Sequence, residues 1–107
     1  MNADTERLNI AVDADGFLID PEQWNEVVAN RLAEADGIGP LTDAHWAVIR
    51  ALRRHWEKAH GLPAPHHICH ETQQPHHCLE TLFGGSVREA WRIAGLPNPG
   101  TEAVAYM

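Results

Sequence analysis

The chain has 107 residues, of which 44% are apolar and 21% are charged, so it can bury one hydrophobic core and is not a disordered tail. Lys and Arg total 8 against 15 Asp and Glu, a formal net charge of -7, which disfavours nucleic acid as a partner. No apolar run approaches the roughly 20 residues that cross a bilayer, and the N-terminus lacks a signal-peptide pattern. We therefore expect a single cytoplasmic domain over residues 1–107 that does not bind a membrane.

The first predicted elements are a β-hairpin and a helix. Residues 8–18 form two short apolar runs that flank an Asp15-Gly16 pair, and Asp-Gly supplies the positive φ of a tight turn. A helix over about 21–35 is predicted next, because Asp20 offers an N-cap carboxylate and Pro21 suits the first helical position.

Two further helices are predicted from apolar spacing and capping signals. The longest begins at Thr42-Asp43 and is closed by Gly61 and Pro63; its apolar face consists of His45, Val48, Ile49, Leu52 and Trp56. A short helical turn is expected over 66–74, and a last helix runs from a capping box at Ser86 to Gly95. The predicted fold class is mainly α (α+β): a small helical bundle with an N-terminal β-hairpin and a flexible C-terminal arm.

A histidine-rich and cysteine-rich segment is the most unusual feature of the sequence. Five of the eight histidines and both cysteines lie between His66 and Cys78. On a helix, three of these side chains would share one face, and the chain turn at Pro75 would return two more. Such imidazole and thiolate groups are suited to zinc or another soft transition metal. The predicted ligands are His66, Cys69, His70, His77 and Cys78.

Two other interpretations of this segment stay open. A turn at Pro75 would bring Cys69 and Cys78 within the ~6 Å that dithiol chemistry requires. Alternatively, the histidines form a solvated surface and the cysteines are small core residues.

Other polar and aromatic residues have structural interpretations. His45 lies on the apolar face of the long helix, so we interpret it as a buried, hydrogen-bonded residue and not as a catalyst. The four tryptophans follow apolar helical spacing and are interpreted as core. Arg50, Arg53, Arg54 and Lys58 form a basic stripe, which is either a solvated face or a docking surface. No Ser-His-Asp set, phosphate loop or carboxylate pair indicates an enzyme.

The ordered motifs resemble the sulfur-relay family of TusE and DsrC, the latter being the gamma subunit of dissimilatory sulfite reductase. The matching residues are Asp15-Gly16-Phe17-Leu18, Trp24, Leu41-Thr42, His45-Trp46, Arg50, Arg53, Pro63-Ala64, Leu82-Phe83, Ala94-Gly95-Leu96-Pro97 and Pro99. The resemblance implies a helical bundle whose C-terminal arm carries sulfur on a next-to-last cysteine. It also implies sulfur-relay or sulfite-reductase-type proteins as partners.

The sequence departs from this pattern at the positions that carry the chemistry. Its next-to-last residue is Tyr106, Trp91 stands where a second cysteine is expected, and no cysteine follows Cys78. We therefore predict a non-catalytic binding or regulatory homologue that docks through Arg50, Arg53, Arg54 and Tyr106. The alternatives are a metal- or persulfide-binding protein that uses residues 66–78, and a transcriptional regulator, which the acidic net charge disfavours.

Overall fold

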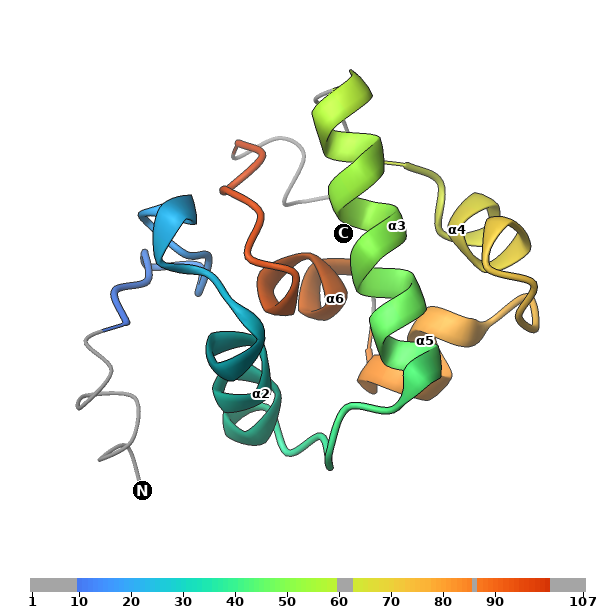
Figure 1. The fold of residues 1–107 in the computed structure, drawn as a ribbon, viewed down its shortest axis with the longest axis horizontal. Helices are drawn as coiled ribbons and strands as arrows, with labels where there is room; N and C mark the ends of the chain where they lie inside the picture. The colour runs from blue at the N-terminus through green and yellow to red at the C-terminus, as the bar shows by residue number, and fades with distance from the viewer. Residues whose placement is uncertain (1–9, 60–62, 86, 101–107) are drawn as a thin grey trace.

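The structure is a computed structural model that describes residues 10–59, 63–85 and 87–100. Within this part of the chain it contains helices and no β-strand, which confirms the mainly α fold class. The elements are the 3-10 turn η1 (Pro21–Gln23) and the helices α2 (Glu26–Ala35), α3 (Asp43–Ala59), α4 (Pro65–Glu71), α5 (Cys78–Phe83) and α6 (Val87–Ile93). Figure 1 shows α3 as a long central column with α2 and α6 on one side and α4 on the other. None of the described helices is long and apolar enough to span a membrane.

The predicted β-hairpin is reduced to a turn with one isolated antiparallel bridge, between Val12 and Leu18. A hairpin needs side chains that alternate between a buried and an exposed face. Here the consecutive residues Phe17 and Leu18 are both buried, with 0% and 2% of their surface exposed. Residues 8 and 9 of the predicted hairpin lie outside the described residues.

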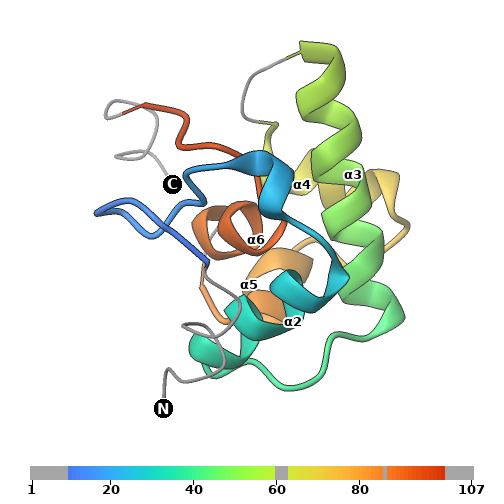
Figure 2. The ribbon, with the colours of Figure 1, turned by 60° about the vertical axis from the view of Figure 1, so that its left-hand side comes forward.

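This turn is fixed by side chains of α6 and of the segment that follows it. Arg92 donates from Nε to the Gly16 carbonyl at 3.1 Å and forms an ion pair with Asp36 at 2.9 Å. The Asn98 amide donates to the carboxylates of Asp13 and Asp15 at 3.0 and 3.1 Å. Figure 2 shows the turn beside α6. Segments about 80 residues apart in the chain therefore form one corner of the molecule.

The carboxylate of Asp13 makes a contribution to the stability of the protein that depends on pH. Burial alone would raise the pKa of Asp13, but hydrogen bonds from Asn98 and from the backbone N–H groups of Asp15 and Phe17 hold the pKa below its ordinary value of 3.8. A carboxyl whose pKa is lowered by folding stabilises the protein above the unfolded-state pKa, and this contribution is lost as pH falls through the folded-state value.

We expect Asp13→Asn to remove this acid-sensitive contribution, because an amide does not titrate. In urea unfolding, the variant should be less stable than the wild type at pH 7, and the difference should shrink as the pH falls toward about 3. A stability difference that is the same at both pH values would contradict this role of Asp13.

The first predicted helix is divided into η1 and α2. Trp24 is extended, and the Asn25 side chain accepts a hydrogen bond from the Val28 N–H, so α2 begins with a new N-cap. The Trp24 indole donates to the Ile93 carbonyl at 2.8 Å. This tertiary contact and the asparagine cap together end the continuous helix that the spacing suggested.

The later helices agree with the prediction, except that the structure contains one helix more. The long helix and the helix before Gly95 are present as α3 and α6, and the turn predicted over 66–74 is α4. Helix α5 was not predicted, and Ser86 lies outside the described residues. Residues 96–100 of the predicted flexible arm are described, and Leu96 is buried with 3% of its surface exposed. The rest of that arm lies outside the described residues.

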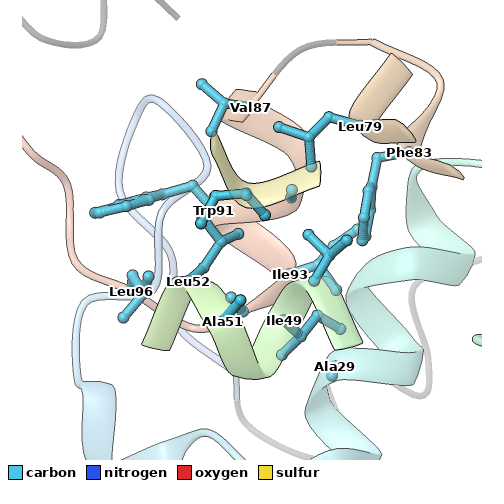
Figure 3. Close-up of a cluster of buried hydrophobic side chains, with 14 of the residues drawn as sticks. Ala29, Ile49, Ala51, Leu52, Leu79, Phe83, Val87, Trp91, Ile93 and Leu96 are labelled. Carbon is cyan, nitrogen blue, oxygen red and sulfur yellow. The ribbon is translucent and has the colours of Figure 1, made fainter. Parts of the chain in front are cut away.

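The core is centred on the contact between α6 and α3. Figure 3 shows Trp91 and Ile93 of α6 facing Ile49 and Leu52 of α3. Trp91 is fully buried and its indole donates to the Pro97 carbonyl at 2.8 Å, so it also holds the segment that leaves α6. The prediction that all four tryptophans are core holds fully only for Trp91. The others are partly buried at the core surface: Trp24, Trp46 and Trp56.

Candidate functional site

A disulfide bond joins the two cysteines of the sequence. Cys69, on the inner face of α4, is bonded to Cys78, the first residue of α5, and their Cα atoms are 5.7 Å apart. The chain between them reverses through Gln73, which has a positive φ of 58°. Both cysteines are buried, with 1% and 3% of their surface exposed. The bond therefore connects α4 to α5 from within the core.

The predicted metal site is not formed, because its two sulfur ligands are bonded to each other. Zinc and other soft metals bind cysteine as a thiolate, which a disulfide does not provide. Within the described ranges, no group of three or more His, Cys, Asp or Glu side chains is arranged to hold a metal ion. Helix α4 also turns Cys69 inward while its histidines are exposed. The predicted metal ligands that do not form a site are His66, Cys69, His70, His77 and Cys78.

The histidines of this segment form an exposed surface cluster. The rings of His66 and His76 are stacked with centroids 5.9 Å apart, and His77 lies edge-on to His76 at 4.9 Å. On α4, His67 lies 3.9 Å from the Glu71 carboxylate. Exposed pairs of this kind contribute little to stability. The geometry therefore fits the interpretation of the histidines as a solvated surface.

His45 is a structural residue that ties α3 to α5. The Thr42 N–H donates to Nδ1 at 3.0 Å, so Nδ1 is an acceptor and the proton is on Nε2, which donates to the Leu82 carbonyl at 2.8 Å. A pocket of about 380 Å³ borders this ring. Because both ring nitrogens already have partners, His45 has no nitrogen available for acid or base catalysis. The geometry matches its interpretation as a buried, hydrogen-bonded residue.

A second pocket, of about 320 Å³, lies where Trp24 approaches α3. We call it the Trp–Arg pocket; its wall includes Trp24, Trp46, Arg50, Arg53 and Arg54. The three arginines are the ones predicted as a docking surface, and the structure brings them together on one stretch of α3. Lys58 is in the last turn of the same helix and outside the pocket wall. Tyr106, the fourth predicted docking residue, lies outside the described residues.

The arginines of the Trp–Arg pocket differ in their surroundings. The Arg53 guanidinium lies 4.0 Å from the Trp24 ring centroid and donates to the Ala94 carbonyl at 2.6 Å. Burial lowers the pKa of Arg53 below its ordinary value, and the nearby Glu57 carboxylate acts in the opposite direction. Arg54 is exposed and pairs with Glu71 at 3.4 Å.

The tryptophans of the pocket were not predicted as site residues. Arg50 lies over the Trp46 ring at 5.8 Å, one helical turn further along α3. This i, i+4 spacing of an aromatic and an arginine was visible in the sequence and could have pointed to the pair. Trp24 carried no such signal, because it reaches the pocket from a different element.

Comparisons with known proteins agree on one family. The family profile described as "DsrC like protein" matches residues 4–101. The chain is 36% identical over 102 residues to "Sulfurtransferase TusE" of Pectobacterium atrosepticum, which covers 88% of this chain and 93% of that protein. It is 32% identical to "Sulfurtransferase TusE homolog" of Haemophilus influenzae, over 86% of this chain and 91% of that protein.

Solved structures of the same kind share the fold. The oxidized gamma-subunit of the dissimilatory sulfite reductase (DsrC) from Archaeoglobus fulgidus superposes with a TM-score of 0.71 at 34% identity, over 86% of this chain and 90% of that one. Dissimilatory sulfite reductase I (DsrI) superposes with a TM-score of 0.75 at 26% identity, over 86% of this chain and 89% of that one.

Proposed function

Because the chain belongs to the DsrC-like family of sulfur-relay proteins, we propose that it is a binding or regulatory member that carries no sulfur itself. The observation that supports this proposal is the buried Cys69–Cys78 disulfide. It occupies both cysteines of the 107-residue sequence. A protein that keeps the scaffold without offering a thiol can still occupy the binding surfaces of relay proteins.

The chemistry of sulfur carriage supports the same conclusion. A persulfide forms on a thiolate, and that thiolate must be accessible to both donor and acceptor. Cys69 and Cys78 are almost completely buried. At position 91, where the family resemblance implies a thiol, the side chain is a fully buried tryptophan.

The proposed role is to bind a sulfur-relay or sulfite-reductase-type protein. Arg50, Arg53 and Arg54 would make the contact through the Trp–Arg pocket, together with Tyr106. The protein would then act as a competitor or regulator of the members that do transfer sulfur.

Incubation with a persulfide donor followed by mass spectrometry of the intact protein tests this function. We expect neither the oxidized nor the dithiothreitol-reduced protein to pass a sulfur atom to an acceptor thiol. The relative from Pectobacterium atrosepticum, named as a sulfurtransferase, is the positive control. An added sulfur atom on Cys69 or Cys78 that moves to the acceptor would overturn the proposal and favour persulfide handling at the internal cysteines.

A further inference from the structure

The Trp–Arg pocket has a rigid aromatic wall. The Trp24 indole is hydrogen-bonded through Nε1 to the Ile93 carbonyl and lies against Gly95, where the Cβ of any other residue would collide with the ring. Trp24 and Trp46 are only partly buried. Trp24 therefore presents a fixed apolar surface to an incoming group, and little side-chain entropy is lost when that surface is covered.

Two guanidinium groups of the pocket lie over these rings and keep hydrogen-bond donors available. Arg50 makes no hydrogen bond or ion pair with any residue that the structure describes, and its guanidinium lies 5.8 Å from the Trp46 ring centroid. Arg53 uses one nitrogen for the Ala94 carbonyl. An arginine that stacks on an aromatic face still has its N–H edge, which matches the two oxygens of a carboxylate.

Two carboxylates in the wall limit the charge that the pocket accepts. Glu26 and Glu57 line it together with the three arginines, so the local excess is one positive charge. A duplex or another polyanion would meet these carboxylates and the acidic remainder of a chain with net charge -7. A single carboxylate beside an apolar side chain suits both the guanidinium edges and the tryptophan rings.

We propose that the Trp–Arg pocket binds an acidic peptide segment of a partner protein, in which one Glu or Asp is flanked by apolar side chains. The carboxylate contacts Arg50 and Arg53, and the apolar neighbours cover Trp24 and Trp46. This inference rests on the proposed function, because it names the chemistry by which the partner is recognised.

Calorimetry with two synthetic peptides tests the proposal on the full chain. The probes are Ac-Gly-Leu-Glu-Phe-Gly-amide and the same peptide with Gln in place of Glu. We expect the Glu peptide to bind at least tenfold more tightly, because hydrogen bonds to a charged group are stronger than neutral ones. In NMR spectra, the indole N–H signals of Trp24 and Trp46 should shift and that of the buried Trp91 should not.

Arg50→Gln is the test variant and Lys58→Gln its matched control. Both residues are exposed on α3, and both changes remove one positive charge. We expect Arg50→Gln to abolish the preference for the Glu peptide and Lys58→Gln to retain it, with the melting temperatures of both close to that of the wild type. The proposal would be overturned if the two peptides bound equally well or if neither bound. It would also be overturned if both variants lost the preference for the Glu peptide to the same extent.

Two further probes identify other occupants. Sodium sulfate that shifts the same indole signals and displaces the peptide at equal concentration would show a simple anion site, and tight binding of duplex DNA at the pocket would show a nucleic-acid surface. Either result would overturn the proposal. Sulfur transfer is measured separately. If the protein transfers no sulfur and does not bind the peptide, only this inference is contradicted. If it transfers sulfur, the proposed function is contradicted.

Discussion

Replacing Trp91 with Ala is expected to lower the free energy of unfolding by about 3 to 5 kcal/mol, the range for removal of a buried aromatic side chain. Trp91 is fully buried, and the Trp56 ring packs edge-on against it with centroids 5.7 Å apart. The loss combines a cavity between α6 and α3 with an unpaired carbonyl at Pro97, whose hydrogen bond from the indole disappears. Urea unfolding followed by circular dichroism measures the effect.

Two other substitutions separate these contributions. Trp91→Phe keeps a large ring and loses the indole N–H, so we expect it to cost clearly less than Trp91→Ala. Trp46→Ala removes a ring that is only partly buried and should also cost less. If Trp91→Ala were no more destabilising than Trp46→Ala, position 91 would not be the centre of the core.

Reduction of the Cys69–Cys78 disulfide is expected to lower the free energy of unfolding by about 3 kcal/mol, from the loop-closure entropy of a closed loop of this length. The bond spans a sequence separation of 9 residues. Without it the unfolded chain gains conformations, whereas the folded state keeps the packing of α4 and α5. Chemical unfolding with and without dithiothreitol measures the difference, and a mass gain of two hydrogen atoms verifies reduction.

The double variant Cys69→Ala/Cys78→Ala is the control. It should be less stable than the oxidized wild type, and dithiothreitol should not change its free energy of unfolding. Unchanged stability of the wild type after verified reduction would show that the bond adds nothing to the fold. The stability of the oxidized and reduced forms also bears on the cell compartment expected for the protein, because disulfides are rare in a reducing cytosol.

The sequence alone determined the features that depend on neighbours along the chain. The apolar spacing along α3 predicted the longest helix, because residues three and four apart share a helix face whatever surrounds them. Gly95 predicted the end of α6, since glycine accepts the positive φ of a helix terminus. The ordered motifs around Trp24, His45 and Gly95 identified the family. His45 was also interpreted correctly, because a polar residue on an apolar face requires hydrogen-bond partners.

Only the tertiary structure decided which distant groups meet. The sequence showed cysteines and histidines close together but not that α4 turns Cys69 inward and His66 outward, which replaces a metal site by a disulfide. It placed the arginines on one helix but not Trp24 beside them, because that contact depends on the hydrogen bond from Trp24 to Ile93, 69 residues away. The hairpin is reduced to one bridge for the same reason, since the burial of both Phe17 and Leu18 depends on parts of the chain far from the turn. Local spacing fixes a helix, whereas a site between helices depends on long-range packing that no single segment encodes.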